Sequence, residues 1–153
     1  MNQTIELKLL RPDVFATIPE YGTTGSAAVD LRAAIDDSVV LNPGDCQLLP
    51  TGVAIHISNP GLAGMIIPRS GLGHKKGLIL GNSVGLIDSD YHGELMVSCW
   101  NRSENELTID PLMRFAQLVI VLFLTIYCSC MRCHFHCNFY STRPITGKQS
   151  FVH

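Results

Sequence analysis

The amino-acid sequence predicts an all-β fold, a jelly-roll-like barrel built from short strands. Three observations lead to this prediction. Apolar or alternating runs recur between residues 5 and 109, residues typical of turns separate these runs, and no run before residue 112 keeps a helical period. Regularly spaced short strands joined by Gly, Pro, Asn and Asp turns are typical of β-sandwiches and barrels.

The expected strands are each bounded by turn residues, and in order they occupy residues 5–10, 27–34, 38–41, 46–57, 63–68, 77–81, 94–100 and 106–109. The clearest turns are Asn42-Pro43-Gly44-Asp45, between the third and fourth runs, and Asn59-Pro60-Gly61, between the fourth and fifth. Gly, Pro, Asn and Asp favour turns because they supply unusual backbone angles or local hydrogen bonds. These turns therefore separate successive strands.

Length and charge limit the function classes. A chain of 153 residues fits one domain. Charged residues make up 16% and the formal net charge is -2, so the chain lacks the basic field that binds long nucleic acids. The N-terminal sequence has no secretion signal, which makes the cytoplasm the expected location.

The composition changes abruptly after Val121. Residues 1–121 have the polar turns of a β domain, whereas residues 122–153 contain no acidic residue and a single glycine. We therefore predict a β domain over 1–121 and an irregular apolar, cysteine-rich tail over 122–153. The apolar stretch from Leu118, even extended to Met131, is shorter than the ~20 residues that cross a bilayer, so no membrane association is expected.

The most informative segment is GNSVGLIDSDYHGEL, Gly81 to Leu95. As strand, turn and strand it would line a narrow slot. Backbone groups at the turn and the side-chain amide of Asn82 can satisfy the acceptor–donor–acceptor edge of uracil, whereas cytosine would leave buried polar groups unpaired. The alternative is an ordinary Gly/Asp-rich hairpin.

Two carboxylates and a tyrosine in this segment suggest chemistry beside the base. Asp88 is the natural base to orient and deprotonate a water molecule, and Asp90 could instead hold the turn. Tyr91 offers a flat face to a deoxyribose, and its bulk could exclude a 2'-hydroxyl. The simpler reading of Tyr91 is that it only packs against the hairpin.

The hexapeptide Pro68 to Gly73 combines a guanidinium, a hydroxyl and two glycines, a set suited to phosphate oxygens. Arg69 would balance charge on the transferred group, and Ser70 would contact a phosphate. Asp30 and Gln117 are polar residues within apolar strands, where each could instead satisfy a neighbouring strand end. Both could hold Mg²⁺ through water, because Mg²⁺ keeps several waters and takes its other oxygens from substrate phosphates.

These segments together resemble the trimeric dUTPase family. Four of that family's five ordered motifs match Ala27–Ala33, Pro68–Gly73, Gly81–Gly93 and Arg114–Gln117. The resemblance implies a jelly-roll fold that hydrolyses dUTP to dUMP and pyrophosphate with Mg²⁺, limiting uracil in DNA and supplying dUMP for dTMP synthesis. It also implies a homotrimer with active sites between subunits.

The resemblance assigns roles by matching position. Asp88 would position the attacking water, and Asp30 and Gln117 would lie near metal-bound waters. The residues that would bind substrate, phosphates first and then base and sugar, are Arg69, Ser70, Gly71, Asn82, Leu86, Ile87, Asp88, Tyr91 and Met96.

Three positions depart from the family pattern. Ala28 replaces a usual glycine, and Leu112 replaces the glycine of a Pro-Gly turn, a position that often has a positive φ. The third departure is the tail, which lacks the glycine-rich fifth motif that closes over the substrate. A translational frameshift near residues 118–123 is the leading explanation of the tail.

The tail leaves competing readings of the function open. Loss of the closing motif would turn an active enzyme into a catalytically impaired dUTP-binding remnant and would put the trimer in doubt. Crowded ligands between Cys128 and Cys137 could bind zinc, although they lack the usual loop between ligand pairs. A dCTP deaminase of the same fold and a regulatory binding module are further alternatives.

Overall fold

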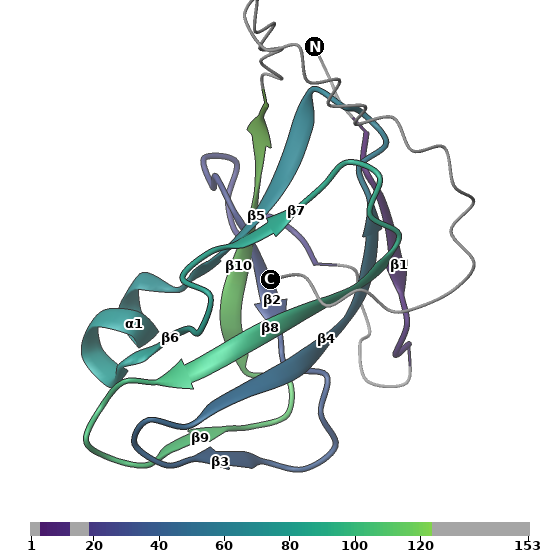
Figure 1. Ribbon diagram of the computed structural model, residues 1–153. Helices are drawn as coiled ribbons and strands as arrows, with labels where there is room; N and C mark the ends of the chain where they lie inside the picture. Colours follow the sequence, from purple (N-terminus) through teal and green to yellow (C-terminus); the bar gives the residue numbers. More distant parts are fainter. Residues whose placement is uncertain (1–3, 13–18, 124–153) are drawn as a thin grey trace, which may run out of the picture.

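The computed structural model describes residues 4–12 and 19–123. Its strands form two four-stranded antiparallel sheets and a two-stranded ribbon (Figure 1). The first sheet has the order β1-β4-β8-β6, with β1 at Glu6–Leu9, β4 at Cys46–His56, β8 at Gly93–Asn101 and β6 at Leu78–Leu80. Each of its strands reverses direction relative to its neighbours.

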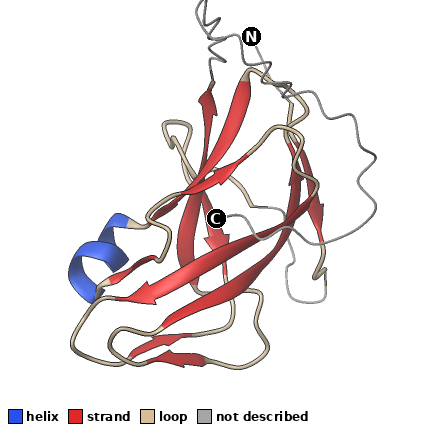
Figure 2. Ribbon diagram, in the orientation of Figure 1, coloured by secondary structure: helices blue, strands red, loops and turns tan. Residues whose placement is uncertain are grey.

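The second sheet has the order β2-β10-β5-β7. Its strands are β2 (Val29–Arg32), β10 (Arg114–Leu122), β5 (Leu62–Pro68) and β7 (Gly85–Ile87), while β3 (Val39–Leu41) pairs with β9 (Leu107–Ile109) in the ribbon. Strands dominate the described residues (Figure 2). The predicted all-β, jelly-roll-like fold is confirmed, and each expected run contains a strand.

The core lies between the two sheets. Phe115 and Leu118 of β10 and Leu95 of β8 are among its buried side chains. Along β8 burial alternates from Leu95 to Asn101, as expected for a strand with one face on the core and one on the surface. The largest fully buried side chains also include two polar ones, Thr51 and Asn101.

One helix, α1 (Ser70–Lys76), lies among the described residues at the edge of the sheets (Figure 2). The sequence pattern gave no sign of it, since seven residues with two glycines leave no helical period to detect. The helix ends at Gly77, whose φ of 77° is left-handed and whose N–H donates to the carbonyl of Leu72. Such a glycine terminus is a common helix stop.

Leu112 has a φ of 62°, the left-handed conformation expected at this turn. The turn is closed by Met113 N–H, which donates to Asp110 O at 3.1 Å, and Arg32 Nη1 donates to the Leu112 carbonyl at 3.0 Å. Ala28, the other departure from the pattern, is not among the described residues with positive φ. Backbone strain is therefore expected at Leu112 rather than at Ala28.

We expect Leu112→Gly to stabilise the protein. A left-handed φ costs a residue with a side chain roughly 1–2 kcal/mol, and glycine returns part of that gain through its larger unfolded-state entropy. The net gain should be about 0.5–1 kcal/mol, a rise of about 2 °C in Tm for a domain of this size. Thermal unfolding at matched protein concentration measures it. Leu112→Ala keeps the strain, so an equal gain with Ala would contradict the explanation.

None of the helices among residues 4–12 and 19–123 is long and apolar enough to cross a membrane. The predicted boundary after Val121 falls within β10, which continues to Leu122. The Cys128–Cys137 cluster that could bind zinc lies outside the described residues.

Candidate active site

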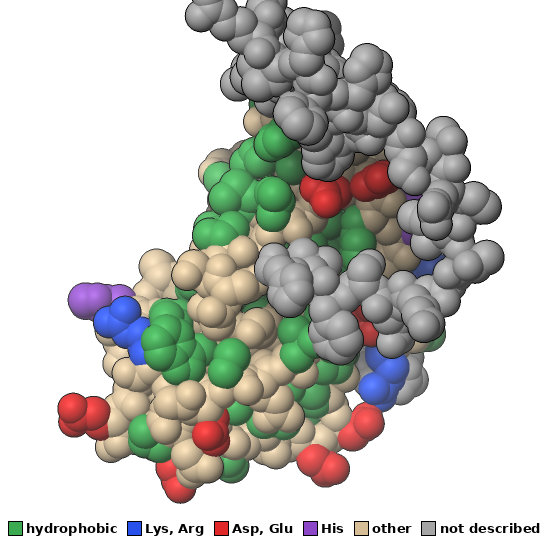
Figure 3. Space-filling view, in the orientation of Figure 1, with side chains coloured by type: hydrophobic (Ala, Val, Ile, Leu, Met, Phe, Trp, Pro, Cys, Tyr) green, Lys and Arg blue, Asp and Glu red, His purple; other side chains and the backbone are tan. Residues whose placement is uncertain are grey.

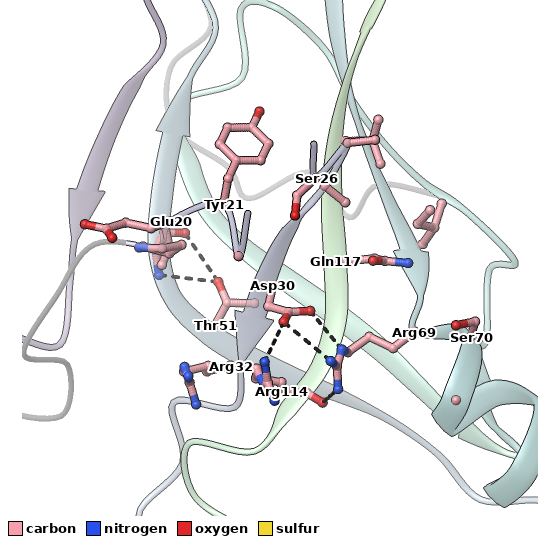
Figure 4. Close-up of a pocket in the computed structure, with 18 residues that line it drawn as sticks. Glu20, Tyr21, Ser26, Asp30, Arg32, Thr51, Arg69, Ser70, Arg114 and Gln117 are labelled. Carbon is pink, nitrogen blue, oxygen red and sulfur yellow. Dashed lines mark hydrogen bonds and ion pairs between the residues drawn. The ribbon is translucent and has the colours of Figure 1, made fainter. Parts of the chain in front are cut away.

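The predicted site residues lie around two hollows. The first, about 770 Å³, has the size typical of small-molecule sites. Five of the predicted residues line it, namely Asp30, Arg69, Ser70, Gly71 and Gln117 (Figure 4). Asp88 and Leu86 line the second hollow. No described residue lines both, so the described part of the chain places the two groups around separate hollows.

Asp30 is the centre of the first hollow's hydrogen bonds (Figure 4). Its Oδ1 accepts from Arg69 Nε at 2.8 Å, and its Oδ2 accepts from Arg114 Nη1 at 3.2 Å. Arg69 Nη1 also donates to the Arg114 carbonyl at 3.3 Å. The carboxylate therefore fixes both guanidiniums, whose remaining N–H groups can bind an anion.

Asp30 and Gln117 are cross-strand partners. They lie directly opposite each other in the register of β2 and β10. Gln117 Nε2 donates to the Pro68 carbonyl at the end of β5, at 3.0 Å. This bond leaves the amide oxygen of Gln117 as its group for a ligand. The two polar side chains that stood out in apolar strands thus lie at one position of the sheet.

The charge of the first hollow favours an anion. Its lining includes three arginines, Arg32, Arg69 and Arg114, against two carboxylates, Glu20 and Asp30. Among the described residues there is no group of three or more His, Cys, Asp or Glu side chains that could hold a metal ion. Any Mg²⁺ here would therefore take most of its oxygens from water and from a bound phosphate.

Ser70 and Gly71 are the first residues of α1, so the predicted phosphate loop is a helical turn instead. Arg69 is the N-cap residue, with extended backbone angles, and its carbonyl accepts from Gly73 N–H at 2.9 Å. Gly71 is open, because a Cβ there would meet no atom within 4 Å. The hydroxyl and the glycine still line the hollow beside Arg69.

The second hollow is lined by acidic, imidazole and apolar groups. Asp88 and Asp90 are both exposed on its wall, together with His56, His92 and the aromatic ring of Phe123. In Figure 3, acidic side chains gather in the upper part of the face shown, next to hydrophobic surface. Exposed carboxylates beside a hollow are available to accept a proton from water.

The segment between Gly81 and Leu95 is not the expected hairpin. Strand β7 pairs with β5 in the second sheet, whereas β8 pairs with β4 and β6 in the first (Figure 1). Residues 88–92 therefore cross from one sheet to the other. The short spacing suggested a hairpin, but β7 gains its backbone partners from β5, which local sequence does not reveal.

Tyr91 is held at the end of this crossing. Its hydroxyl donates to the Glu94 carbonyl at 2.7 Å, and a Cβ on Gly93 would lie 2.5 Å from that hydroxyl oxygen. Burial, and then the charge of Glu94, raise the pKa of the tyrosine above 10.0. Glycine at 93 thus permits the ring position, and the phenol stays neutral at physiological pH.

Asn82, Ile87, Tyr91 and Met96 line neither hollow. Asn82 is exposed in the turn after β6, where its carbonyl accepts from Val84 N–H at 2.7 Å. Ile87 is buried in β7, and Met96 is 37% exposed on β8. Their contacts with a base and sugar stay a prediction, since neither of the two hollows among the described residues includes them.

The turn that carries Asn82 lies closely against β4 and β8. A Cβ on Gly81 would lie 2.5 Å from Cys46 Sγ and 2.7 Å from Ser98 Oγ, so this position accepts no larger residue without displacement. Of the two cysteines in the described residues, Cys99 is buried, and its burial and then Cys46 raise its pKa to about 12. Cys99 is therefore no nucleophile at neutral pH.

Sequence reasoning missed Arg32 and Arg114 as site residues. They lie opposite each other in the register of β2 and β10, and both line the first hollow. The sequence did contain a signal for them, because each arginine is a charged residue close to Asp30 or Gln117 in the same segment. Glu20, Tyr21 and Ser26, which also line this hollow, stand in a turn-rich segment without a comparable signal.

Comparison with protein families gives one assignment for most of the chain. The dUTPase family model matches residues 15–140. A curated deoxyuridine 5'-triphosphate nucleotidohydrolase of Francisella philomiragia subsp. philomiragia is 65% identical over 117 residues, 76% of this chain and 79% of the relative. The same enzyme of Francisella tularensis subsp. novicida is 63% identical over equal shares.

Solved structures give the same result. A mutant dUTPase from phage phi11 of S. aureus, whose structure describes the coordination of a structural Mg(II) ion, has a TM-score of 0.74 and 25% identity, covering 85% of this chain and 97% of its own. Staphylococcus bacteriophage 80alpha dUTPase with dUpNHpp has a TM-score of 0.74 and 26% identity, covering 86% and 89%.

Proposed function

The chain belongs to the dUTPase family, and we propose that it hydrolyses dUTP to dUMP and pyrophosphate with Asp88 as the base. The observation that carries the proposal is the division of the surface into an arginine-lined hollow around Asp30 and a carboxylate-lined hollow around Asp88. The first suits a triphosphate, and the second suits activation of water.

The reaction requires little covalent chemistry by the protein itself. Asp88 takes a proton from a water molecule while the oxygen of that water attacks the α-phosphorus. The bond from this phosphorus to the bridging oxygen then breaks, and pyrophosphate leaves. Positioning and stabilisation of negative charge supply most of the rate in phosphoryl transfer. The exposure of Asp88 and its position in a loop anchored at both ends by strands support this role.

Arg69, Ser70 and Gly71 are proposed to bind the phosphates, and Arg114 is added to them. The Asp30 carboxylate holds both guanidiniums from one side, which preorganises them for anionic oxygens. Mg²⁺ bound to the phosphates would neutralise part of their charge, and its water ligands would meet Asp30 and the Gln117 amide oxygen. The Asp30 carboxylate already accepts hydrogen bonds from two arginines. This supports contact with Mg²⁺ through water rather than directly.

Asn82, Leu86, Ile87, Tyr91 and Met96 are proposed to recognise uracil and deoxyribose. The exposed amide of Asn82 and the turn backbone next to it offer donors and acceptors. Gly81 N–H donates to the Ser98 carbonyl at 2.9 Å, which ties this turn to β8. A fixed hydrogen-bonding edge rejects a wrong base because the mismatched groups stay unpaired.

We also propose that the protein assembles as a homotrimer. The two hollows share no described residue, so a complete site would need groups from different copies. The outer face of β4 and β8 carries exposed Leu48, Met96 and Trp100, and hydrophobic side chains gather over β6 and β8 in Figure 3. Exposed apolar surface of this kind is typical of protein interfaces. A cytoplasmic location stays a prediction from the sequence.

The relatives favour an active enzyme over the impaired remnant, because the curated proteins at 65% and 63% identity are nucleotidohydrolases.

Loss of the amine in a dCTP deaminase would need a general acid or base beside the C4 atom of the base. The segment from Gly81 to Leu95 instead carries the pattern expected for uracil.

The direct test is Mg²⁺-dependent pyrophosphate release from dUTP by the purified full chain, compared with dCTP, dTTP and UTP. We expect dUTP to be preferred by at least about a hundredfold in kcat/KM, since mismatched hydrogen-bonding groups cost several kcal/mol. Removal of Mg²⁺ with EDTA should abolish release. Equal turnover of dUTP and dCTP would refute uracil recognition, and binding of dUTP without release would support the remnant.

A further inference from the structure

A row of three side chains crosses the first sheet beside the second hollow. Glu6 of β1 lies opposite His56 at the end of β4. Ile55 lies opposite Gly93, so the next position along, His92, lies opposite His56. The imidazole rings of His56 and His92 stack with centroids 3.9 Å apart and planes inclined by 28°, and His56 Nδ1 lies 3.3 Å from Glu6 Oε2.

This row adjoins the loop that carries Asp88. His92 is the last residue of the crossing from β7 to β8, and the same crossing is tied to the β4–β5 connection by Ser58 N–H, which donates to the Ser89 carbonyl at 2.8 Å. Tyr91 N–H closes the turn on the Asp88 carbonyl at 3.2 Å. Both imidazoles line the hollow that Asp88 and Asp90 line. The stacked rings thus form a side-chain clamp that joins the crossing to β4, in addition to the backbone hydrogen bond between Ser58 and Ser89.

We propose that the row of Glu6, His56 and His92 positions the Asp88 loop, and that protonation of both imidazoles loosens it. The inference rests on the proposed function, because the row acts on turnover only through Asp88. His56 and His92 are positioning residues, since neither needs to touch the reacting atoms. Histidine is the side chain whose charge ordinarily changes between about pH 5 and 8.

The charged groups around the two rings determine how the stack responds to pH, a response called the switch below. Protonation of both imidazoles places two cations in direct stacking contact, which opposes the stack. The other charged groups on the surrounding elements are Asp88 and Asp90 of the loop and, in the next row of the same sheet face, Lys8 and Glu94. The carboxylates attract each imidazolium and Lys8 repels it, whereas two imidazoliums stacked with centroids 3.9 Å apart repel each other.

Two substitutions of one residue test the clamp. His92→Ala removes the stack, and we expect kcat for dUTP at pH 8 to fall about tenfold with KM changed less than about twofold, as for a small misplacement of a catalytic group. His92→Phe keeps an aromatic ring without a charge and should restore kcat to within about threefold. His74→Phe, an exposed histidine of α1, is the matched control and should equal the wild type.

The pH profile separates the switch from simple packing. Between pH 8 and pH 5.5 the wild type should lose about fivefold more kcat than His92→Phe, because only the wild type gains the second imidazolium. Equal kcat for His92→Ala and His92→Phe at pH 8 would overturn the positioning role. Superimposable pH profiles of the wild type and His92→Phe would overturn the switch.

Amide hydrogen exchange over residues 88–92 tests the clamp without turnover. At pH 8 the loop should exchange at similar rates in the wild type and His92→Phe, and about tenfold faster in His92→Ala. At pH 5.5 the wild type should exchange faster than His92→Phe. If the wild type fails to hydrolyse dUTP, the proposed function falls while these exchange rates still decide whether the clamp exists; unchanged exchange in all variants would overturn it.

Discussion

Asp88→Asn is expected to lower kcat for dUTP by about a thousandfold, within the range lost when a general base is removed. The amide has the shape of the carboxylate and can still hold a water molecule, but it cannot accept the proton. The turn itself does not depend on the side chain, since it is the Asp88 carbonyl that accepts from Tyr91 N–H. Folding and substrate binding should therefore survive the change.

Asp90→Asn is the matched control for this prediction. Asp90 lies two residues away in the same loop, is also exposed and lines the same hollow, so the two variants carry the same change of charge. We expect it to lower kcat less than about tenfold, since a distant charge acts only through the field. Pyrophosphate release at saturating Mg²⁺ measures kcat, and calorimetry with dUpNHpp measures binding. Equal losses in the two variants would remove the special role of Asp88.

Most of the strands were predictable because each is a local pattern. Apolar runs bounded by turn residues place eight of the ten strands in the described residues to within a few residues, as for the run at 46–57 and strand β4, Cys46–His56, whereas β7 and β10 lie in no expected run. The left-handed φ of Leu112 was also predictable, because it depends on a Pro-turn position and not on distant contacts. Such features are encoded in neighbouring residues, and the sequence contains them completely.

The missed features depend on contacts between distant segments. Strand β7 joins β5 rather than β8, and short strands carry no signal for their partner. The pairing of Asp30 with both Arg69 and Arg114 requires the registers of three strands at once. Charge and polarity identified Asp30, Gln117 and Arg69 individually, but not that they share one hollow.

Asn101→Ala is expected to destabilise the protein strongly. Asn101 is fully buried, and its Nδ2 donates to the carbonyls of Leu41 and Asn105 at 2.9 and 2.8 Å. Its Oδ1 accepts from both the N–H and the hydroxyl of Ser103. One side chain thus joins the end of β8 to β3 and to the following loop, and Ala would leave these groups without their partner.

The expected cost is about 3–5 kcal/mol, since unsatisfied buried groups and a cavity add to the lost bonds, and Tm should fall by about 10 °C for a domain of this size. Asn101→Asp separates the two causes. It keeps the volume but replaces the NH₂ donor with an oxygen that faces two carbonyls, so it should cost at least as much as Ala at neutral pH. Asn105→Ala, which alters an exposed amide in the same loop, should change stability by less than about 0.5 kcal/mol. If Asn101→Asp unfolded at the wild-type temperature, the hydrogen bonds of this amide would not be what holds β3 to β8, and packing around the buried side chain would have to do so instead.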